Sequence, residues 1–256
     1  PEHLVSADFN QDGFADLAAT NGASGVVSVS LGQSSGGFQL TVNCSTGHSL
    51  SGLVAADLNG DGILDLAATS AESTSFTVLL GTGSCAFLVQ PNQFVAPMPF
   101  ALSAGDMNGD GIEDLAISGL IIDQTYLYGV SLYLGTVNGM FRDAGQALTD
   151  SWPAAIVSGD PDGDGVTDVV TANQGEYYSG CDCYTGGGNL TVLYGSRGDS
   201  LVRRSDLPVG IGPFAVAVGD FDHDHRLDIA AVCVGKWNGT TYSYPGGDSV
   251  WIWLGQ

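Results

Sequence analysis

One short acidic segment occurs five times in this chain, and this repeat limits the available folds more than any other feature. The copies align without gaps, and their first residues lie 49, 49, 54 and 60 residues apart. A period near 50 residues indicates repeated structural units that each pack against their neighbours. The copies are DFNQDGFADL from Asp8, DLNGDGILDL from Asp57, DMNGDGIEDL from Asp106, DPDGDGVTDV from Asp160 and DFDHDHRLDI from Asp220.

The spacing of oxygen-bearing side chains within each copy predicts a metal site. Such side chains occupy positions 1, 3, 5 and 9, and glycine occupies position 6 in every copy but the last. A short loop wraps a hard cation in this way, with a backbone carbonyl at position 7 and glycine at the sharp turn. An all-oxygen set favours calcium over magnesium, which keeps its waters, and over transition metals. Hairpin turns would explain the glycines but not the repeated carboxylates.

The loops differ from EF-hands, although their first six residues match that pattern. An EF-hand requires Glu at position 12. The five residues found there are Ala19, Ala68, Ile117, Thr171 and Ala231. The flanking segments are short apolar or alternating runs, which are typical of strands. We therefore expect each loop to join two β-strands.

Two further strands follow in most repeats, and together they predict an all-β propeller. A third strand ending in glycine is expected at 26–32, 76–81, 130–135, 190–195 and 250–255, and a fourth follows it in the first four repeats. Four antiparallel strands every ~50 residues are the signature of a propeller blade. We expect one domain over 1–256, with blades at about 1–48, 49–97, 98–150, 151–209 and 210–256.

The last repeat lacks its fourth strand, and an unpaired edge is a liability for a sheet. Either five blades form a ring with an incomplete last blade, or the chain is part of a larger ring. We favour the ring of five.

The repeats resemble the FG-GAP or VCBS repeats of integrin α-subunit propellers and of bacterial extracellular proteins. That resemblance implies up to five calcium ions, one in each loop joining strands 1 and 2. By similarity, the side-chain ligands are Asp8, Asn10, Asp12, Asp16, Asp57, Asn59, Asp61, Asp65, Asp106, Asn108, Asp110, Asp114, Asp160, Asp162, Asp164, Asp168, Asp220, Asp222, Asp224 and Asp228. The carbonyls of Phe14, Ile63, Ile112, Val166 and Arg226 complete the shells. His225 replaces the expected glycine, so we expect a weaker fifth site.

The excess of acidic residues also argues against two classes of binding partner, nucleic acids and anionic membranes. The chain has 28 acidic residues, 17 of them Asp inside these loops, against 6 basic residues, which gives a net charge of −22. Such a surface repels nucleic acid and anionic membranes. No apolar run approaches the ~18 residues of a membrane span. Because the chain opens at Pro1 without a signal-like segment, we expect a mature, extracellular or cell-surface product. Weak calcium sites also need extracellular calcium concentrations.

The connections between strands 2 and 3 lengthen in blades 3–5 and are rich in aromatic residues. Tyr and Trp among Gly, Ser and Asn are typical of recognition surfaces, although long loops also pack their own aromatics into a small cluster. We expect a glycan or protein ligand there; the candidate residues are Tyr126, Tyr128, Tyr177, Tyr178, Tyr184, Trp237, Tyr242 and Tyr244.

The five cysteines show no metal-binding spacing. Cys233 is expected on the same face as the neighbouring blade's Cys181 and Cys183, so we predict one disulfide from Cys233 to either of them.

No catalytic motif is present, and the sequence favours a binding module over an enzyme. The four histidines stand outside any Ser/His/Asp pattern. A glycosidase or lyase needs two convergent carboxylates, and the long loops do offer Asp123, Glu176, Asp182 and Asp248. The alternatives are therefore a carbohydrate-active hydrolase or lyase, or a structural segment of a larger surface protein.

Overall fold

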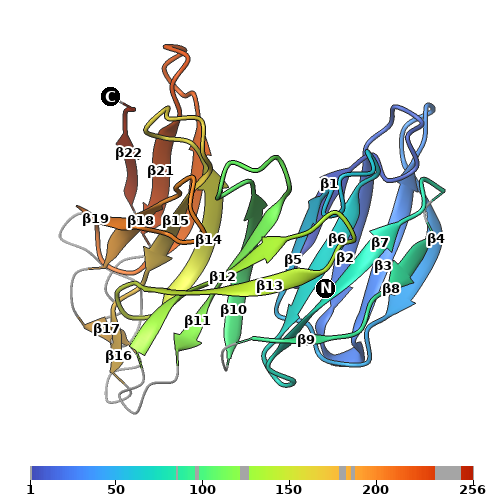
Figure 1. Ribbon diagram of the computed structural model, residues 1–256, viewed down its shortest axis with the longest axis horizontal. Coiled ribbons are helices and arrows are strands. Elements are labelled where there is room, and N and C mark those ends of the chain that lie inside the picture. Colours follow the sequence, from blue (N-terminus) through green and yellow to red (C-terminus); the bar gives the residue numbers. More distant parts are fainter. Residues whose placement is uncertain are drawn as a thin grey trace.

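A computed structural model describes residues 2–84, 86–95, 98–121, 127–178, 183–185, 188–233 and 249–255. This part of the chain is all-β apart from one short 3-10 turn, η1 (Gly22–Ser24). Five antiparallel sheets follow one another along the chain and stand side by side like propeller blades (Figure 1). Within the described ranges, no helix is long and apolar enough to cross a membrane.

Each of the first four blades has four strands in chain order, and the fifth has three described strands. Blade 1 comprises β1 (Leu4–Ala7), β2 (Asp16–Asn21), β3 (Val26–Gly32) and β4 (Phe38–Ser45). Blade 2 comprises β5 (Gly52–Ala56), β6 (Asp65–Ser70), β7 (Ser75–Gly81) and β8 (Phe87–Val89), with β9 (Gln93–Phe94) also paired to β7. Blade 3 comprises β10 (Pro99–Gly105), β11 (Asp114–Ile121), β12 (Leu127–Gly135) and β13 (Phe141–Leu148).

Blade 4 comprises β14 (Pro153–Gly159), β15 (Asp168–Asn173), β18 (Asn189–Tyr194) and β19 (Arg203–Pro208), and blade 5 comprises β20 (Pro213–Gly219), β21 (Asp228–Cys233) and β22 (Ser249–Trp253). These sheets confirm the predicted architecture of four-stranded blades. A small hairpin that was not predicted, β16 (Glu176–Tyr178) and β17 (Cys183–Thr185), lies within the connection between strands 2 and 3 of blade 4.

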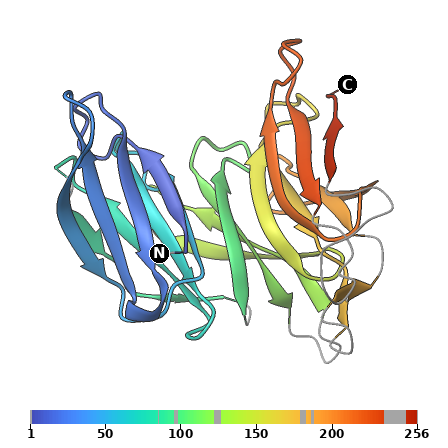
Figure 2. The ribbon, with the colours of Figure 1, turned by 180° about the vertical axis from the view of Figure 1, so that it is seen from behind.

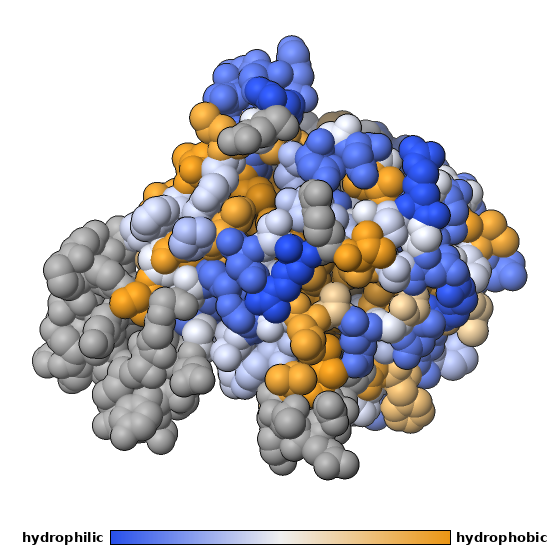
Figure 3. Space-filling view, turned by 60° about the vertical axis from the view of Figure 1, so that its left-hand side comes forward, coloured by the Kyte–Doolittle hydropathy of each residue, from blue (hydrophilic) through white to orange (hydrophobic). Residues whose placement is uncertain are grey.

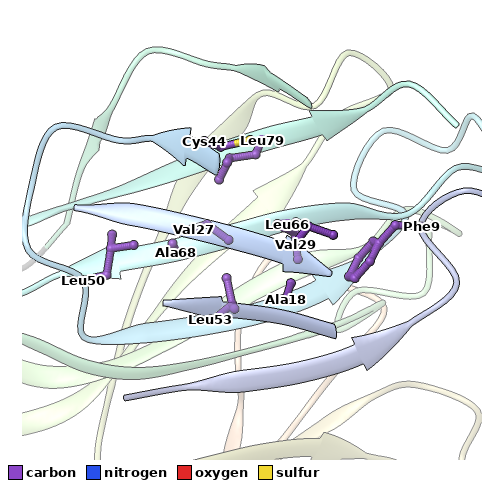
Figure 4. Close-up of a cluster of buried hydrophobic side chains, with 10 residues drawn as sticks. All are labelled: Phe9, Ala18, Val27, Val29, Cys44, Leu50, Leu53, Leu66, Ala68 and Leu79. Carbon is purple, nitrogen blue, oxygen red and sulfur yellow. The ribbon is translucent and has the colours of Figure 1, made fainter. Parts of the chain in front are cut away.

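The alternating direction of side chains along each strand explains how the blades pack. Successive side chains of a strand point to opposite faces, so an inner blade buries one set against each neighbour. In blade 2, Leu66 and Ala68 pack in a cluster with blade 1, while Ala67 and Val78 pack in a cluster with blade 3. Figure 4 shows the first of these clusters, in which Phe9 of blade 1 lies beside the blade 2 strands. Apolar residues on both faces therefore give the inner strands their nearly continuous apolar sequences.

Four apolar clusters join the five blades, one between each consecutive pair. The first strands of successive blades, β1, β5, β10, β14 and β20, lie next to one another. Blades 1 and 5 stand at opposite ends of the molecule (Figures 1 and 2), so the described residues form an open arc and do not close the ring of five that we favoured from the sequence.

The outward faces of the two end blades both carry exposed apolar side chains. On blade 1, Leu4 and Phe38 are exposed, and the Ser28 hydroxyl bonds to the side chains of Asn21 and Asn43. On blade 5, Val232, Val250 and Ile252 are exposed.

Candidate metal centre

The five acidic loops join the first and second strands of their blades. They project from one end of the blades, at the top of Figure 1, whereas the β16–β17 hairpin lies at the opposite end. The position of the loops follows from antiparallel strand order and agrees with the sequence prediction.

Backbone N–H groups organise the carboxylates at positions 1 and 5 in the same way in every loop. In the second loop, the carboxylate of Asp57 accepts the N–H groups of Asp61 at 3.1 Å and Gly62 at 2.7 Å. The Asp61 carboxylate accepts the N–H of Ile63 at 2.8 Å. The equivalent bonds form in the other four loops. The loops are thus wrapped around their own acid side chains.

Left-handed backbone conformations at two positions make this wrapping achievable. Position 6 has positive φ in all five loops, as the glycines there indicated. Position 4 also has positive φ throughout, with φ of 75° at Gly60 and 60° at Gln11. The left-handed conformation at position 4 was not predicted, because this position is not always glycine. In the fifth loop both positions are histidine, with φ of 66° at His223 and 71° at His225. Non-glycine residues in this region are strained.

The aspartate at position 9 ties the loop to the third strand. It is the first residue of strand 2 in each blade and is at most 1% exposed. In blade 2, one Asp65 oxygen accepts the N–H of Leu58 at 3.0 Å and the other accepts the N–H of Gly81 at 2.7 Å. Position 9 is therefore a structural residue as well as a candidate ligand, and this role was not predicted.

The fourth loop breaks this pattern. Position 2 is Pro161, which has no N–H, so one oxygen of Asp168 is buried without a hydrogen-bond partner. Its other oxygen accepts the N–H of Gly195 at 2.9 Å. A buried, unpaired carboxylate oxygen costs free energy unless a cation or donor reaches it. The fourth loop therefore fits a bound cation.

Burial raises the pKa of three of these position-9 carboxyls. Desolvation, partly offset by the backbone hydrogen bonds, brings the pKa of Asp65 and of Asp114 to about 6. Asp168 has only one such bond and faces Asp160, Asp162 and Asp164, and its pKa rises to about 7. Asp168 is therefore the carboxylate whose charge is least compensated by the protein itself.

Three acids converge closely in the last two loops. The side-chain oxygens of Asp160, Asp162 and Asp168 lie within 4.8 Å of one another, and those of Asp220, Asp222 and Asp224 do the same. Both groups could hold a metal ion. In loops 1–3 position 3 is Asn10, Asn59 or Asn108, whose amide donates to the carboxylate at position 5.

The fifth loop also contains a positively charged side chain that contacts one of its aspartates. The Arg226 guanidinium donates to Asp224 at 2.9 Å and lowers the pKa of that carboxyl. Arg226 at position 7 therefore competes with a metal ion for one predicted ligand. Together with the strained His225, this supports the expectation of a weaker fifth site.

A group of aromatic side chains lies at the opposite end of the blades. The rings of Phe100 and Trp152 stack at 5.0 Å, and Tyr128 packs against Trp152 at 6.0 Å. All three rings are partly exposed. The backbone φ of Trp152 is 60°, an uncommon conformation for a bulky residue. We call Phe100, Tyr128 and Trp152 the aromatic cluster. Only Tyr128 was predicted, because the other two come from strand ends rather than from the long loops.

Charged side chains border the aromatic cluster. Arg204 donates to Asp206 at 2.9 Å and to Asp150 at 3.1 Å. Asp150 also accepts the amide of Asn189, and the N–H of Thr149 bonds to the carbonyl of Tyr128. Asp150 and Asp206 keep roughly half of their side-chain surface exposed, at 55% and 41%. Partly exposed rings beside exposed acids form a surface suited to a polar ligand.

The remaining predicted ligand-binding residues lie outside what the structure describes. These are Tyr126, Trp237, Tyr242 and Tyr244, together with the side chains of Tyr177, Tyr178 and Tyr184. Cys233 is a buried free thiol, so the predicted disulfide from Cys233 is not formed in this structure. Cys181 and the side chain of Cys183 lie outside the described part.

Comparison with known proteins agrees with this architecture. A family model described as an FG-GAP-like repeat matches residues 8–68 and 106–171. No curated protein matches the chain. Among solved structures, the chain is similar to a Bacteroides uniformis protein provisionally described as a 6-phosphogluconolactonase, with a TM-score of 0.60 and 12% identity over 98% of this chain and 84% of that chain. At this identity the similarity concerns the fold alone.

Proposed function

Because this chain carries FG-GAP-like repeats, we propose that it is a calcium-stabilised binding module that acts outside the cell or at its surface. FG-GAP repeats are typical of extracellular proteins, where calcium is abundant enough to fill weak sites. The proposed ligand is a glycan or a protein, held at the end of the blades away from the acidic loops.

The unpaired oxygen of Asp168 is the observation that carries the calcium part of this proposal. In the fourth loop the side chains of Asp160, Asp162 and Asp168 converge, and one buried oxygen of Asp168 has no protein donor. A hard divalent cation prefers such an all-oxygen set. Bound calcium would hold the carboxylates in their ionised form and stabilise the folded state by mass action.

The aromatic cluster and its charged border support the binding part. Partly exposed aromatic rings supply area and stacking at low entropic cost, and exposed acids supply hydrogen bonds to hydroxyl or amide groups. Phe100, Tyr128 and Trp152 offer the rings, and Asp150 and Asp206 offer the acceptors. The net charge of −22 disfavours anionic ligands, so a neutral glycan or a basic protein segment fits best.

A glycan array probed with the calcium-loaded protein tests this proposal. We expect binding to specific glycans that is lost in Trp152→Ala, because this variant removes the central ring of the cluster. Phe94→Ala is a matched control, since Phe94 is 81% exposed on β9 and lies outside the cluster. EDTA should weaken binding through loss of stability. If both variants bind like the parent protein, the ligand site lies elsewhere.

A further inference from the structure

One side chain of the first acidic loop reaches across to the second acidic loop. The amide of Gln11, at position 4 of the first loop, donates to the carbonyl of Gly62, at position 6 of the second loop, at 2.9 Å. The two residues lie 51 positions apart in the chain, so they meet only because blades 1 and 2 pack together. Both are exposed, at the hydrophilic end of the molecule that carries the acidic loops (Figures 1 and 3). The two loops are therefore joined across the interface between the blades.

The backbone of Gln11 is strained at the position that makes this contact. Position 4 is glycine in the second, third and fourth loops, where a left-handed conformation carries no steric penalty. Gln11 adopts the same conformation, with φ of 60°, although its side chain makes that conformation unfavourable. Strained residues persist where surrounding contacts hold them, and they cluster at functional positions. A glycine would fit this turn better than Gln11, but it has no side chain to contact Gly62.

Gly62 lies among the candidate calcium ligands of the second loop. Its N–H donates to the carboxylate of Asp57, at position 1, at 2.7 Å. Its neighbours in the chain are Asp61, whose carboxylate is a candidate ligand, and Ile63, whose carbonyl is another. The hydrogen bond from Gln11 therefore restrains the segment of the second loop that orders three of its candidate ligands.

Gln11 lies between two candidate ligands of its own loop, Asn10 at position 3 and Asp12 at position 5. The side-chain oxygen of Asn10 accepts the N–H of Asp12 at 3.0 Å, and its amide donates to the Asp12 carboxylate at 2.9 Å. A cation held by Asn10 and Asp12 would fix the backbone between them, and with it the direction of the Gln11 side chain. Order in the first loop is thereby passed to Gly62 of the second.

We propose that Gln11 couples the first two acidic loops, so that calcium bound in one loop raises the affinity of the other loop for calcium. This inference rests on the calcium sites of the proposed function. The first ion orders one loop, and the hydrogen bond then holds the ligands of the other loop, so the second ion has less of the chain to order. The effect is reciprocal, because each ion must change the affinity for the other by the same factor. One exposed hydrogen bond corresponds to a factor of about two to ten.

Calcium titrations of the whole chain, followed by ¹H–¹⁵N NMR, test the proposal. The amide signals of Gly13 and Gly62, at position 6 of their loops, report separately on loops 1 and 2. The affinity of loop 2 is compared between the parent protein and Asp12→Ala, which disables loop 1. We expect loop 2 of Asp12→Ala to bind calcium about two- to tenfold more weakly. The amide of Gly165 in loop 4 is the internal control, and its half-saturation should not change.

Gln11→Met separates the hydrogen bond from the change in charge that Asp12→Ala brings. Methionine has a similar length to glutamine and the same strained backbone, but it has no donor for the carbonyl of Gly62. In the Gln11→Met background, we expect Asp12→Ala to leave the affinity of loop 2 unchanged. Gln11→Gly fits position 4 without strain, so it should give the same result even if Gln11→Met folds poorly.

The outcomes distinguish this coupling from the calcium sites themselves. Equal affinity of loop 2 in the parent protein and in Asp12→Ala would overturn the coupling. So would a loss of affinity on Asp12→Ala that is the same with and without the Gln11 amide, because the effect would then be one of charge alone. In both cases the calcium sites would stand. Absence of calcium binding to loops 1 and 2 of the parent protein would overturn the coupling and the proposed sites together.

Discussion

Pro161 leaves one carboxylate oxygen of Asp168 buried without a hydrogen bond. In the other four loops the residue at position 2 donates its N–H to the aspartate at position 9, at 2.8–3.0 Å. Blade 4 therefore keeps the strand geometry of its neighbours but gives up one donor. We expect a cation to compensate this oxygen, which makes the fourth loop the most informative place to test the metal site.

Restoring that donor should lower the pKa of Asp168. In Pro161→Ala the new N–H reaches the unpaired oxygen, and a hydrogen bond to the charged form favours ionisation. We expect the pKa to fall from about 7 towards the value of about 6 shared by Asp65 and Asp114. Carbon-detected NMR of the calcium-free protein measures this titration. An unchanged pKa would mean that desolvation by burial, and not the missing donor, sets the raised value.

Removal of calcium should destabilise the protein strongly. A site with a dissociation constant of ~10⁻⁴ M contributes about 2.7 kcal/mol at ~10 mM calcium. Since 1 kcal/mol shifts the melting temperature of a protein of this size by about 2–4 °C, loss of two or more sites should lower it by about 10 °C or more. Differential scanning calorimetry with EDTA, followed by calcium in excess, measures this change. The same melting temperature in EDTA and in calcium would contradict the proposed metal sites.

Calcium-free protein should lose stability as the pH rises. The folded-state pKa of Asp65, Asp114 and Asp168 lies above the ordinary value of 3.8, so the folded state binds more protons than the unfolded state. The stability that these three carboxyl groups contribute to the folded state is thus fully present below about pH 4. It is lost as the pH rises through about 6–7. Thermal melts in EDTA should therefore show a lower melting temperature at pH 8 than at pH 5. With calcium bound, the difference should shrink or reverse, because calcium favours the ionised carboxylates.

Alanine substitutions at two aspartates of the second loop should have different effects on the free energy of unfolding. Asp65→Ala leaves the buried N–H groups of Leu58 and Gly81 without acceptors, and we expect a loss of about 2–5 kcal/mol even in EDTA. Asp61→Ala removes the side-chain bonds to Asn59 and Ile63 within an exposed loop, so it should matter mainly when calcium is present. Urea unfolding of both variants, with and without calcium, separates the two roles. Equal losses in EDTA would mean that position 9 has no special structural part.

Relief of strain in the fifth loop should stabilise the fold. His225→Gly removes the cost of a side chain at φ of 71°, and we expect a gain of about 1 kcal/mol. His225→Ala is the matched control, because alanine keeps the strained conformation and should bring no gain. The contact between His225 and Asp220 is 3.9 Å long at an exposed ring, so its loss should matter little. Calorimetry of the three proteins gives the comparison.

The repeat spacing determined most of the local structure. Period, alternation and the acidic loops predicted the strands that begin at Asp16, Asp65 and Asp114 and the blades they belong to. Glycine at position 6 likewise predicted the left-handed turns. These features depend on residues close together in the chain, where local sterics and periodicity decide the outcome.

Tertiary structure decided what depends on distant residues. Phe100 and Trp152 meet only because blades 3 and 4 pack together, and Phe76 meets Phe141 only at the interface between blades 2 and 3. Packing between blades is non-directional burial of surface, so short sequence patterns do not encode which surfaces remain uncovered.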